Sequence, residues 1–196
     1  MTVKYLEDFA AGQTFGSGRL VVETEQIKRF AAAFDPQPFH LDEKAAQETV
    51  FRGLAASGWH TAAVTMRLLV ESELKPAGGI VGAGFDEFRW PRPVRPGDEL
   101  RLKSEVLDVR SSASRPNQGL IKVRTTTLNQ NDEPVQILVA NLVVLRRSIA
   151  DAGVSSSTSQ RTRPIAPIRS LRRKKSAQTG NKFQSKAPNQ NLRSCP

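Results

Sequence analysis

A wide apolar stripe in the middle of the chain constrains the fold more than any other feature. Between Trp59 and Val70, eight of twelve residues are apolar, which is too many for a helix that lies on a protein surface. This helix is expected to begin near Ser57-Gly58, to end near Glu73 and to be buried on most sides. At about 15 residues it is too short to cross a membrane.

Four segments after this helix have the pattern of β-strands, and polar or proline-containing turns separate them. Consecutive strands joined by short polar turns pair antiparallel. The sequence therefore predicts an α+β fold in which an antiparallel sheet wraps around a long central helix. The predicted strands cover residues 80–90, 99–109, 120–128 and 135–145, with a further strand at 14–22 and shorter helices at 24–34 and 42–48.

Charge divides the chain into two parts. Residues 1–147 carry 19 Lys and Arg against 18 Asp and Glu, whereas residues 148–196 carry ten against one, a net charge of +9. The nearly neutral body is not expected to bind nucleic acid specifically, because phosphate neutralisation needs clustered Lys and Arg on the fold itself. The second part is rich in Ser, Pro and Arg, and we expect a disordered basic tail whose partner is RNA, an anionic membrane or nothing.

Several classes of protein are not expected from this composition. There is no run of 18 apolar residues and no apolar segment near the N-terminus, so neither a membrane span nor a secretory signal is predicted. The chain has one cysteine, Cys195, and two histidines, too few for an internal disulfide or a usual structural zinc site. We expect a cytoplasmic protein that needs no metal.

The segment from Phe34 to Asp42 carries the first candidate chemistry. Asp35 and His40 are five residues apart, in a stretch that two prolines are expected to keep out of a helix. A carboxylate and an imidazole suit general acid–base catalysis, in which they hold a water and move its proton. The alternatives are an aspartate that ends a helix and a histidine with a structural role.

The start of the apolar helix is the second candidate. Ser57 is suited to cap the helix, and Gly58 leaves the first backbone N–H open to a ligand. Free amides at the positive end of a helix stabilise a developing oxyanion such as a thioester enolate, and an ordinary capped helix is the alternative. Arg92 and Arg95 lie near a proline-rich turn, where they either meet a ligand phosphate or belong to a solvated turn.

Three stretches in the same order resemble the MaoC-like dehydratases, the (R)-specific enoyl-CoA hydratase family with a hot-dog fold. Residues 35–40 resemble the family pattern Asp-x-Asn-Pro-x-His, with Gln37 in place of Asn. Residues 53–58 are similar to the segment that leads into the hot-dog helix, where Ser57 replaces a frequent His. Residues 88–98 resemble the strand and turn that follow. The resemblance covers about residues 8–147 and leaves 148–196 as the tail.

The resemblance implies a hydro-lyase that hydrates a trans-2-enoyl-CoA to a (3R)-3-hydroxyacyl-CoA or catalyses the reverse dehydration. Asp35 and His40 would activate water, and the Gly58 N–H would hold the thioester oxygen. Substrate binding is expected of Gln37, Ser57, Trp59, Arg92 and Arg95. The resemblance implies no metal and no cofactor beyond the coenzyme A of the substrate, and it implies a homodimer or higher homo-oligomer.

Two other functions remain open at this stage. A hot-dog thioesterase would use a carboxylate to direct water at the thioester carbonyl, although His40 and Pro38 favour the hydratase. A non-catalytic module that binds acyl thioesters is the other alternative. The length and branching of the acyl chain do not follow from the sequence.

Overall fold

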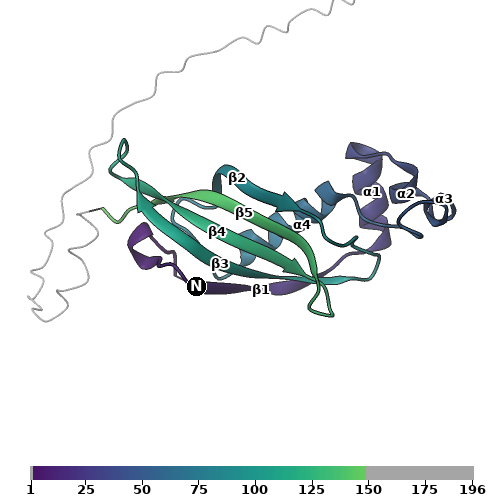
Figure 1. Cartoon of the computed structure of the whole chain (residues 1–196), viewed down its shortest axis with the longest axis horizontal. Coiled ribbons are helices and arrows are strands. Elements are labelled where there is room, and N and C mark those ends of the chain that lie inside the picture. The colour runs from purple at the N-terminus through teal and green to yellow at the C-terminus, as the bar shows by residue number, and fades with distance from the viewer. Residues whose placement is uncertain (1, 149–196) are drawn as a thin grey trace, which may run out of the picture. The chain divides into compact units, whose positions relative to one another are not determined.

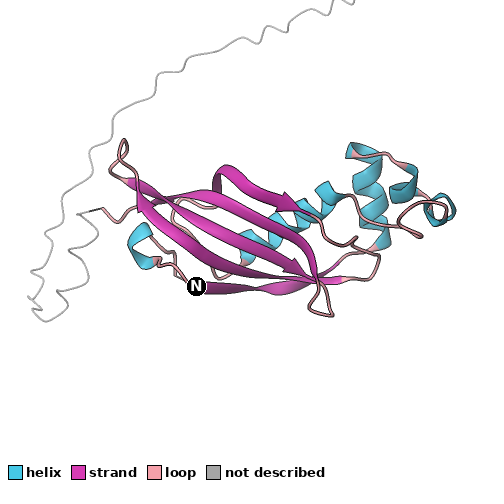
Figure 2. Ribbon diagram, in the orientation of Figure 1, coloured by secondary structure: helices cyan, strands magenta, loops and turns pink. Residues whose placement is uncertain are grey.

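Residues 2–148 are described by a computed structural model, and the predictions made for residues 149–196 lie outside them. A five-stranded antiparallel sheet has helix α4 along one of its faces, and the helices of residues 24–47 gather beyond one end of the sheet (Figures 1 and 2). In chain order the elements are η1 (Leu6–Asp8), β1 (Thr14–Val21), α1 (Thr24–Phe34), α2 (Pro38–Leu41), α3 (Glu43–Gln47), α4 (Gly58–Glu71), β2 (Val81–Arg89), β3 (Glu99–Ser111), β4 (Gln118–Leu128) and β5 (Pro134–Leu145).

The strand order in the sheet is β1-β3-β4-β5-β2. The predicted strands and the antiparallel pairing of β3, β4 and β5 are confirmed. Pairing of β2 with β3, which a simple turn at 91–98 would give, is wrong. Instead β2 pairs with β5 at one edge and β3 pairs with β1 near the other, so residues 90–98 cross the end of the sheet.

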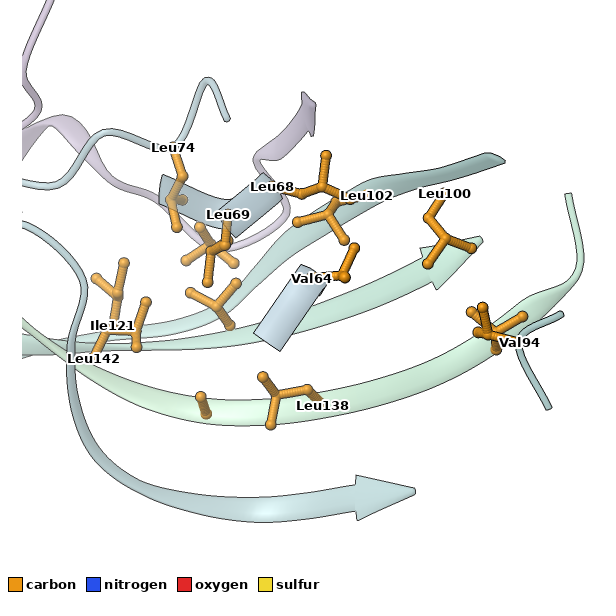
Figure 3. Close-up of a cluster of buried hydrophobic side chains, with 14 of the residues drawn as sticks. Val64, Leu68, Leu69, Leu74, Val94, Leu100, Leu102, Ile121, Leu138 and Leu142 are labelled. Carbon is orange, nitrogen blue, oxygen red and sulfur yellow. The ribbon is translucent and has the colours of Figure 1, made fainter. Parts of the chain in front are cut away.

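The core lies between α4 and the sheet (Figure 3). Val64, Leu68 and Leu69 of α4 are buried against alternating side chains of the strands, such as Leu102 and Ile121. This alternation is the period of two that places every second strand residue on one face. The core residues also include Leu74, Val94, Leu100, Leu138 and Leu142.

Helix α4 is less buried than its sequence predicts. In the single chain Trp59 is 60% exposed, Met66 42% and Val70 52%. The expectation that the helix is buried on most sides is therefore wrong for the isolated chain, because the sheet covers only one of its faces. Among residues 2–148, no helix is both long and apolar enough to cross a membrane.

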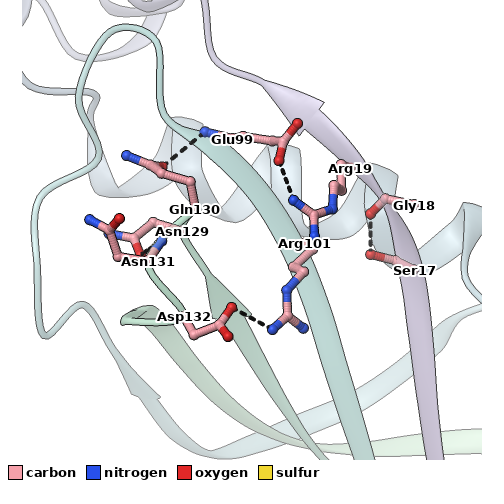
Figure 4. Close-up of polar contacts among 9 residues, drawn as sticks. All are labelled: Ser17, Gly18, Arg19, Glu99, Arg101, Asn129, Gln130, Asn131 and Asp132. Atoms are coloured by element: carbon pink, nitrogen blue, oxygen red, sulfur yellow. Dashed lines mark hydrogen bonds and ion pairs between the residues drawn. The ribbon is translucent and has the colours of Figure 1, made fainter.

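Polar contacts fix the end of the sheet where the crossing segment runs (Figure 4). The Glu99 N–H donates to Gln130 Oε1 at 3.2 Å, and the Glu99 carboxylate accepts from Arg19 at 2.5 Å. The Gln130 amide donates to Asp98 Oδ1 at 2.9 Å, and Asp98 Oδ2 accepts from the Arg95 N–H at 2.7 Å. The β4–β5 turn therefore anchors the segment that follows β2.

The helices beyond the end of the sheet contain one surprise. Helix α1 ends at Phe34 with Asp35 as its C-cap, as expected when proline follows. Residues 38–41, however, form the one-turn helix α2, whereas the two prolines were expected to keep this stretch out of a helix. Pro38 occupies the first helical position of α2, where its missing N–H has no partner to lose.

Candidate active site

The predicted site residues meet around a pocket of about 420 Å³ at the start of α4. Seven of the eight residues singled out from the sequence line it, and Arg95 is the exception. The seven residues are Asp35, Gln37, His40, Ser57, Gly58, Trp59 and Arg92.

Asp35 is held at the C-terminal end of α1 by its backbone N–H and by two side-chain hydrogen-bond donors. Its N–H closes the helix onto the Ala31 carbonyl at 2.9 Å. The Ser57 hydroxyl donates to Oδ2 at 2.6 Å, and the Gln37 amide donates to Oδ1 at 2.7 Å. These two hydrogen bonds, first that of Ser57 and then that of Gln37, lower the pKa of Asp35.

His40 is buried between aromatic rings, and its orientation is set by the backbone. Its Nδ1 lies 2.7 Å from the Ala55 carbonyl oxygen. Because a carbonyl only accepts, this contact assigns the hydrogen of the neutral ring to Nδ1 and leaves Nε2 as an acceptor. Phe39 and Phe51 pack around the imidazole, with ring centroids 4.5 and 6.0 Å away.

Asp35 and His40 each place a hydrogen-bond acceptor, Oδ2 and Nε2, on the same side of the pocket. His40 Nε2 lies 3.4 Å from Asp35 Oδ2. An ionised carboxylate and an unprotonated ring nitrogen repel each other unless a proton donor lies beside both. A water that donates one hydrogen to each satisfies both groups and leaves its oxygen lone pairs free for attack.

The first turn of α4 supplies donors to the same pocket. Ser57 caps the helix, and its Oγ accepts from the Trp59 N–H at 3.2 Å. Within residues 2–148 the Gly58 N–H has no acceptor, as is usual for the first N–H of a helix. The Trp90 indole lies against Gly58 so closely that a Cβ there would be 2.9 Å from Trp90 Cε2. Glycine is therefore the residue that fits beneath this ring.

Of the two arginines expected to bind substrate, one lines the pocket and the other does not. Arg92 reaches the pocket while its guanidinium lies 3.4 Å from the Glu133 carboxylate. Arg95 is not among the residues that line the pocket, and it donates to the carbonyls of Gly53, Leu54 and Phe51. In this structure the guanidinium of Arg95 holds residues 51–54 in place, and its role in substrate binding stays a prediction.

Sequence reasoning missed the aromatic wall of the pocket, formed by Phe39, Phe51 and Trp90. Trp90 is fixed by a hydrogen bond from Nε1 to Gln136 Oε1 at 2.9 Å, and it contacts Trp59 edge to face. The aromatic residues near Asp35 and in the 88–90 stretch were visible in the sequence. Their convergence was not, because it depends on the crossing of residues 90–98 to the start of α4.

A five-stranded antiparallel sheet packed against one long helix, with a carboxylate–imidazole pair beside the helix N-terminus, is the arrangement of a hot-dog protein of the hydratase and dehydratase class. A family model described as "MaoC like domain" matches residues 8–129. The chain belongs to this MaoC-like family, as its sequence indicated.

The chain is similar to several known proteins. The uncharacterized protein YdeM of Bacillus subtilis strain 168 is 36% identical over 140 residues, which are 71% of this chain and 96% of YdeM. The crystal structure of a MaoC-like dehydratase from Rhodospirillum rubrum is 55% identical, with a TM-score of 0.72, over 74% of this chain and 99% of that one. The R-hydratase PhaJ1 of Pseudomonas aeruginosa shares the fold at 23% identity, with a TM-score of 0.59, over 84% of this chain and 96% of that one.

Proposed function

We propose that the chain hydrates a trans-2-enoyl-CoA to a (3R)-3-hydroxyacyl-CoA, or catalyses the reverse dehydration. The observation that carries this proposal is the pair of acceptors, Asp35 Oδ2 and His40 Nε2, 3.4 Å apart beside the free N–H of Gly58. A water held by the first two groups meets a thioester whose oxygen is held by the third.

In the hydration direction, the water oxygen forms a bond to C3 as one water proton passes to His40 Nε2. The electrons of the C2–C3 double bond move toward the thioester, and the negative charge that develops on its oxygen is stabilised by the Gly58 N–H and the positive end of α4. C2 then takes the proton from His40, so one water is consumed and the site returns to its starting state. Asp35 stays ionised and orients the water.

The proposal includes a homodimer formed through β2. This strand lies at an edge of the sheet and pairs only with β5 among the described strands. Its side chains Val81 and Phe85 are 47% and 60% exposed, and the exposed residues Met66 and Val70 of α4 add to the uncovered apolar surface. An exposed apolar edge strand is normally covered in a stable protein, and a second copy would cover it. Cytoplasmic location and the absence of a cofactor stay predictions.

The test is loss of the enoyl absorbance when the protein is mixed with crotonyl-CoA and with a longer trans-2-enoyl-CoA. Asp35→Asn is expected to lower turnover by about 10²-fold or more, because the water loses the acceptor that orients it. Asp108→Asn is the control, because Asp108 is an exposed carboxylate on β3 outside the pocket. Release of free thiol without hydration would favour the thioesterase. Binding without either reaction would favour the acyl-thioester-binding module.

A further inference from the structure

The Ser57 hydroxyl is already fully occupied as a donor. Ser57 is 1% exposed, and its Oγ donates to Asp35 Oδ2 at 2.6 Å while it accepts from the Trp59 N–H at 3.2 Å. A serine has a single hydroxyl hydrogen. Because that hydrogen is directed at Asp35, none remains for a substrate, which is the role expected of Ser57 from the sequence.

This hydroxyl joins the two halves of the site. Asp35 comes from the end of α1, and Ser57 stands 22 residues later at the start of α4. One hydrogen bond therefore links the carboxylate that orients water to the helix turn whose Gly58 N–H faces the thioester. With Gln37 holding Oδ1, the Ser57 bond fixes the plane of the carboxylate and the position of Oδ2 relative to His40.

We propose that Ser57 is a positioning residue that holds the Asp35 carboxylate in register with His40 and with the first turn of α4. This inference rests on the proposed function for its kinetic consequence, but the hydrogen bond itself is testable without any substrate. Holding reacting groups within a few tenths of an ångström is worth large factors in rate, although the positioning group takes no part in the bond changes.

The experiment compares Ser57→Ala with three other variants. Ser57→Gly removes the same hydrogen bond but keeps an acceptable helix cap, since glycine in place of serine at this position costs little. Ser57→Thr restores a hydroxyl. Ser72→Ala is the matched control, because Ser72 is 2% exposed at the other end of α4 and its hydroxyl donates to the Leu69 carbonyl.

Two readouts are measured on each variant. The first is the pKa of Asp35, read from the titration of its carboxyl carbon by NMR and assigned with the Asp35→Asn protein. The second is the kcat and KM for hydration of crotonyl-CoA. Ser57→Ala and Ser57→Gly are expected to raise the pKa of Asp35 and to lower kcat by about 10- to 100-fold, as for a lost hydrogen bond to a charged group. KM should change little, Ser57→Thr should recover part of kcat, and Ser72→Ala should alter neither readout.

An unchanged Asp35 titration in both Ser57→Ala and Ser57→Gly would overturn the proposal. A raised KM with unchanged kcat would also overturn it, because that result marks uniform binding of the substrate. If the wild-type protein hydrated no enoyl-CoA, the proposed function would fail while the titration still tested the hydrogen bond. If Asp35→Asn were inactive and Ser57→Ala fully active, the proposed function would stand and the role of Ser57 would fail.

Discussion

Replacing Gly58 by alanine tests how tightly the pocket wall is packed. The new Cβ would lie 2.9, 3.0 and 3.1 Å from three carbons of the Trp90 indole. The 2.9 Å contact forces the ring to move, because real Cβ atoms essentially never approach other atoms so closely, and the other two contacts are tighter than nine in ten real ones. The ring is not free to move without cost, since its Nε1 donates to Gln136 Oε1 and Gln136 is 1% exposed.

The expected loss of stability follows from the clash with the Trp90 ring and from the hydrogen bond between Trp90 and Gln136. Overpacking of a well-packed site costs about 1–3 kcal/mol, and a buried acceptor left without its donor costs about 1–3 kcal/mol. Alanine returns up to about 1 kcal/mol through its better helix propensity. We expect Gly58→Ala to lower the free energy of unfolding by about 2 kcal/mol, which moves a urea midpoint by roughly 1 M.

The assay is urea unfolding of four proteins: the wild type, Gly58→Ala, Trp90→Phe and the double variant. The cost of Gly58→Ala should be smaller in the Trp90→Phe background, where a smaller ring stands over the helix. Gly18→Ala is the control, since a Cβ at Gly18 has no atom within 4 Å. An equal cost of Gly58→Ala in both backgrounds, or no greater cost than Gly18→Ala, would refute the reasoning.

Three further predictions concern other parts of the fold. Arg95→Ala should lower the free energy of unfolding by about 2–3 kcal/mol, because carbonyls of residues 51–54 lose a charged donor. In the same urea assay, Arg95→Lys should recover part of this free energy. Two variants as stable as the wild type would contradict the prediction. Burial lowers the pKa of His60 below 6.5, so the stability it contributes is complete above pH 6.5 and is lost as the pH falls through the folded-state pKa. Between pH 7.5 and 5, the free energy of unfolding of His60→Phe should therefore fall less than that of the wild type. Equal falls in the two proteins would contradict this prediction. Phe85→Glu should shift the mass measured by sedimentation equilibrium from that of a dimer to that of a monomer. Val50→Glu, which changes an exposed residue outside β2, should leave the mass unchanged. An unchanged mass for Phe85→Glu would exclude the β2 interface.

The sequence predicts those parts of the fold that depend on local pattern. Alternation along β3 and β4 marks the strands, and Asp35-Pro36 marks the end of α1. The position of β2 does not follow, because edge pairing with β5 is decided by contacts about 50 residues apart. Helix α2 was missed for a simpler reason: proline ends a helix from within but is compatible with its first turn.

In the candidate site, too, some features follow from local sequence and others depend on contacts between distant residues. The residue types at Asp35, His40 and Gly58 indicate chemistry on their own, since few combinations supply a base and an oxyanion donor. The tasks of Ser57 and Arg95 do not follow from the sequence. Each depends on partners 22 to about 44 residues away along the chain, brought close only by the fold. Both had been expected to bind substrate, whereas each is committed to a protein group.

The order of elements along the chain has a consequence for synthesis on the ribosome. Helix α4 is complete at residue 71, but strands β2 to β5, which form most of the sheet, are made later, and β5 ends only at Leu145. While residues 72–145 are being made, the growing chain therefore carries an apolar helix without the complete sheet that buries it. Exposed apolar segments of this kind promote aggregation before folding is complete. The helix that organises the site is thus also an apolar segment of the nascent chain that needs protection until the sheet is made.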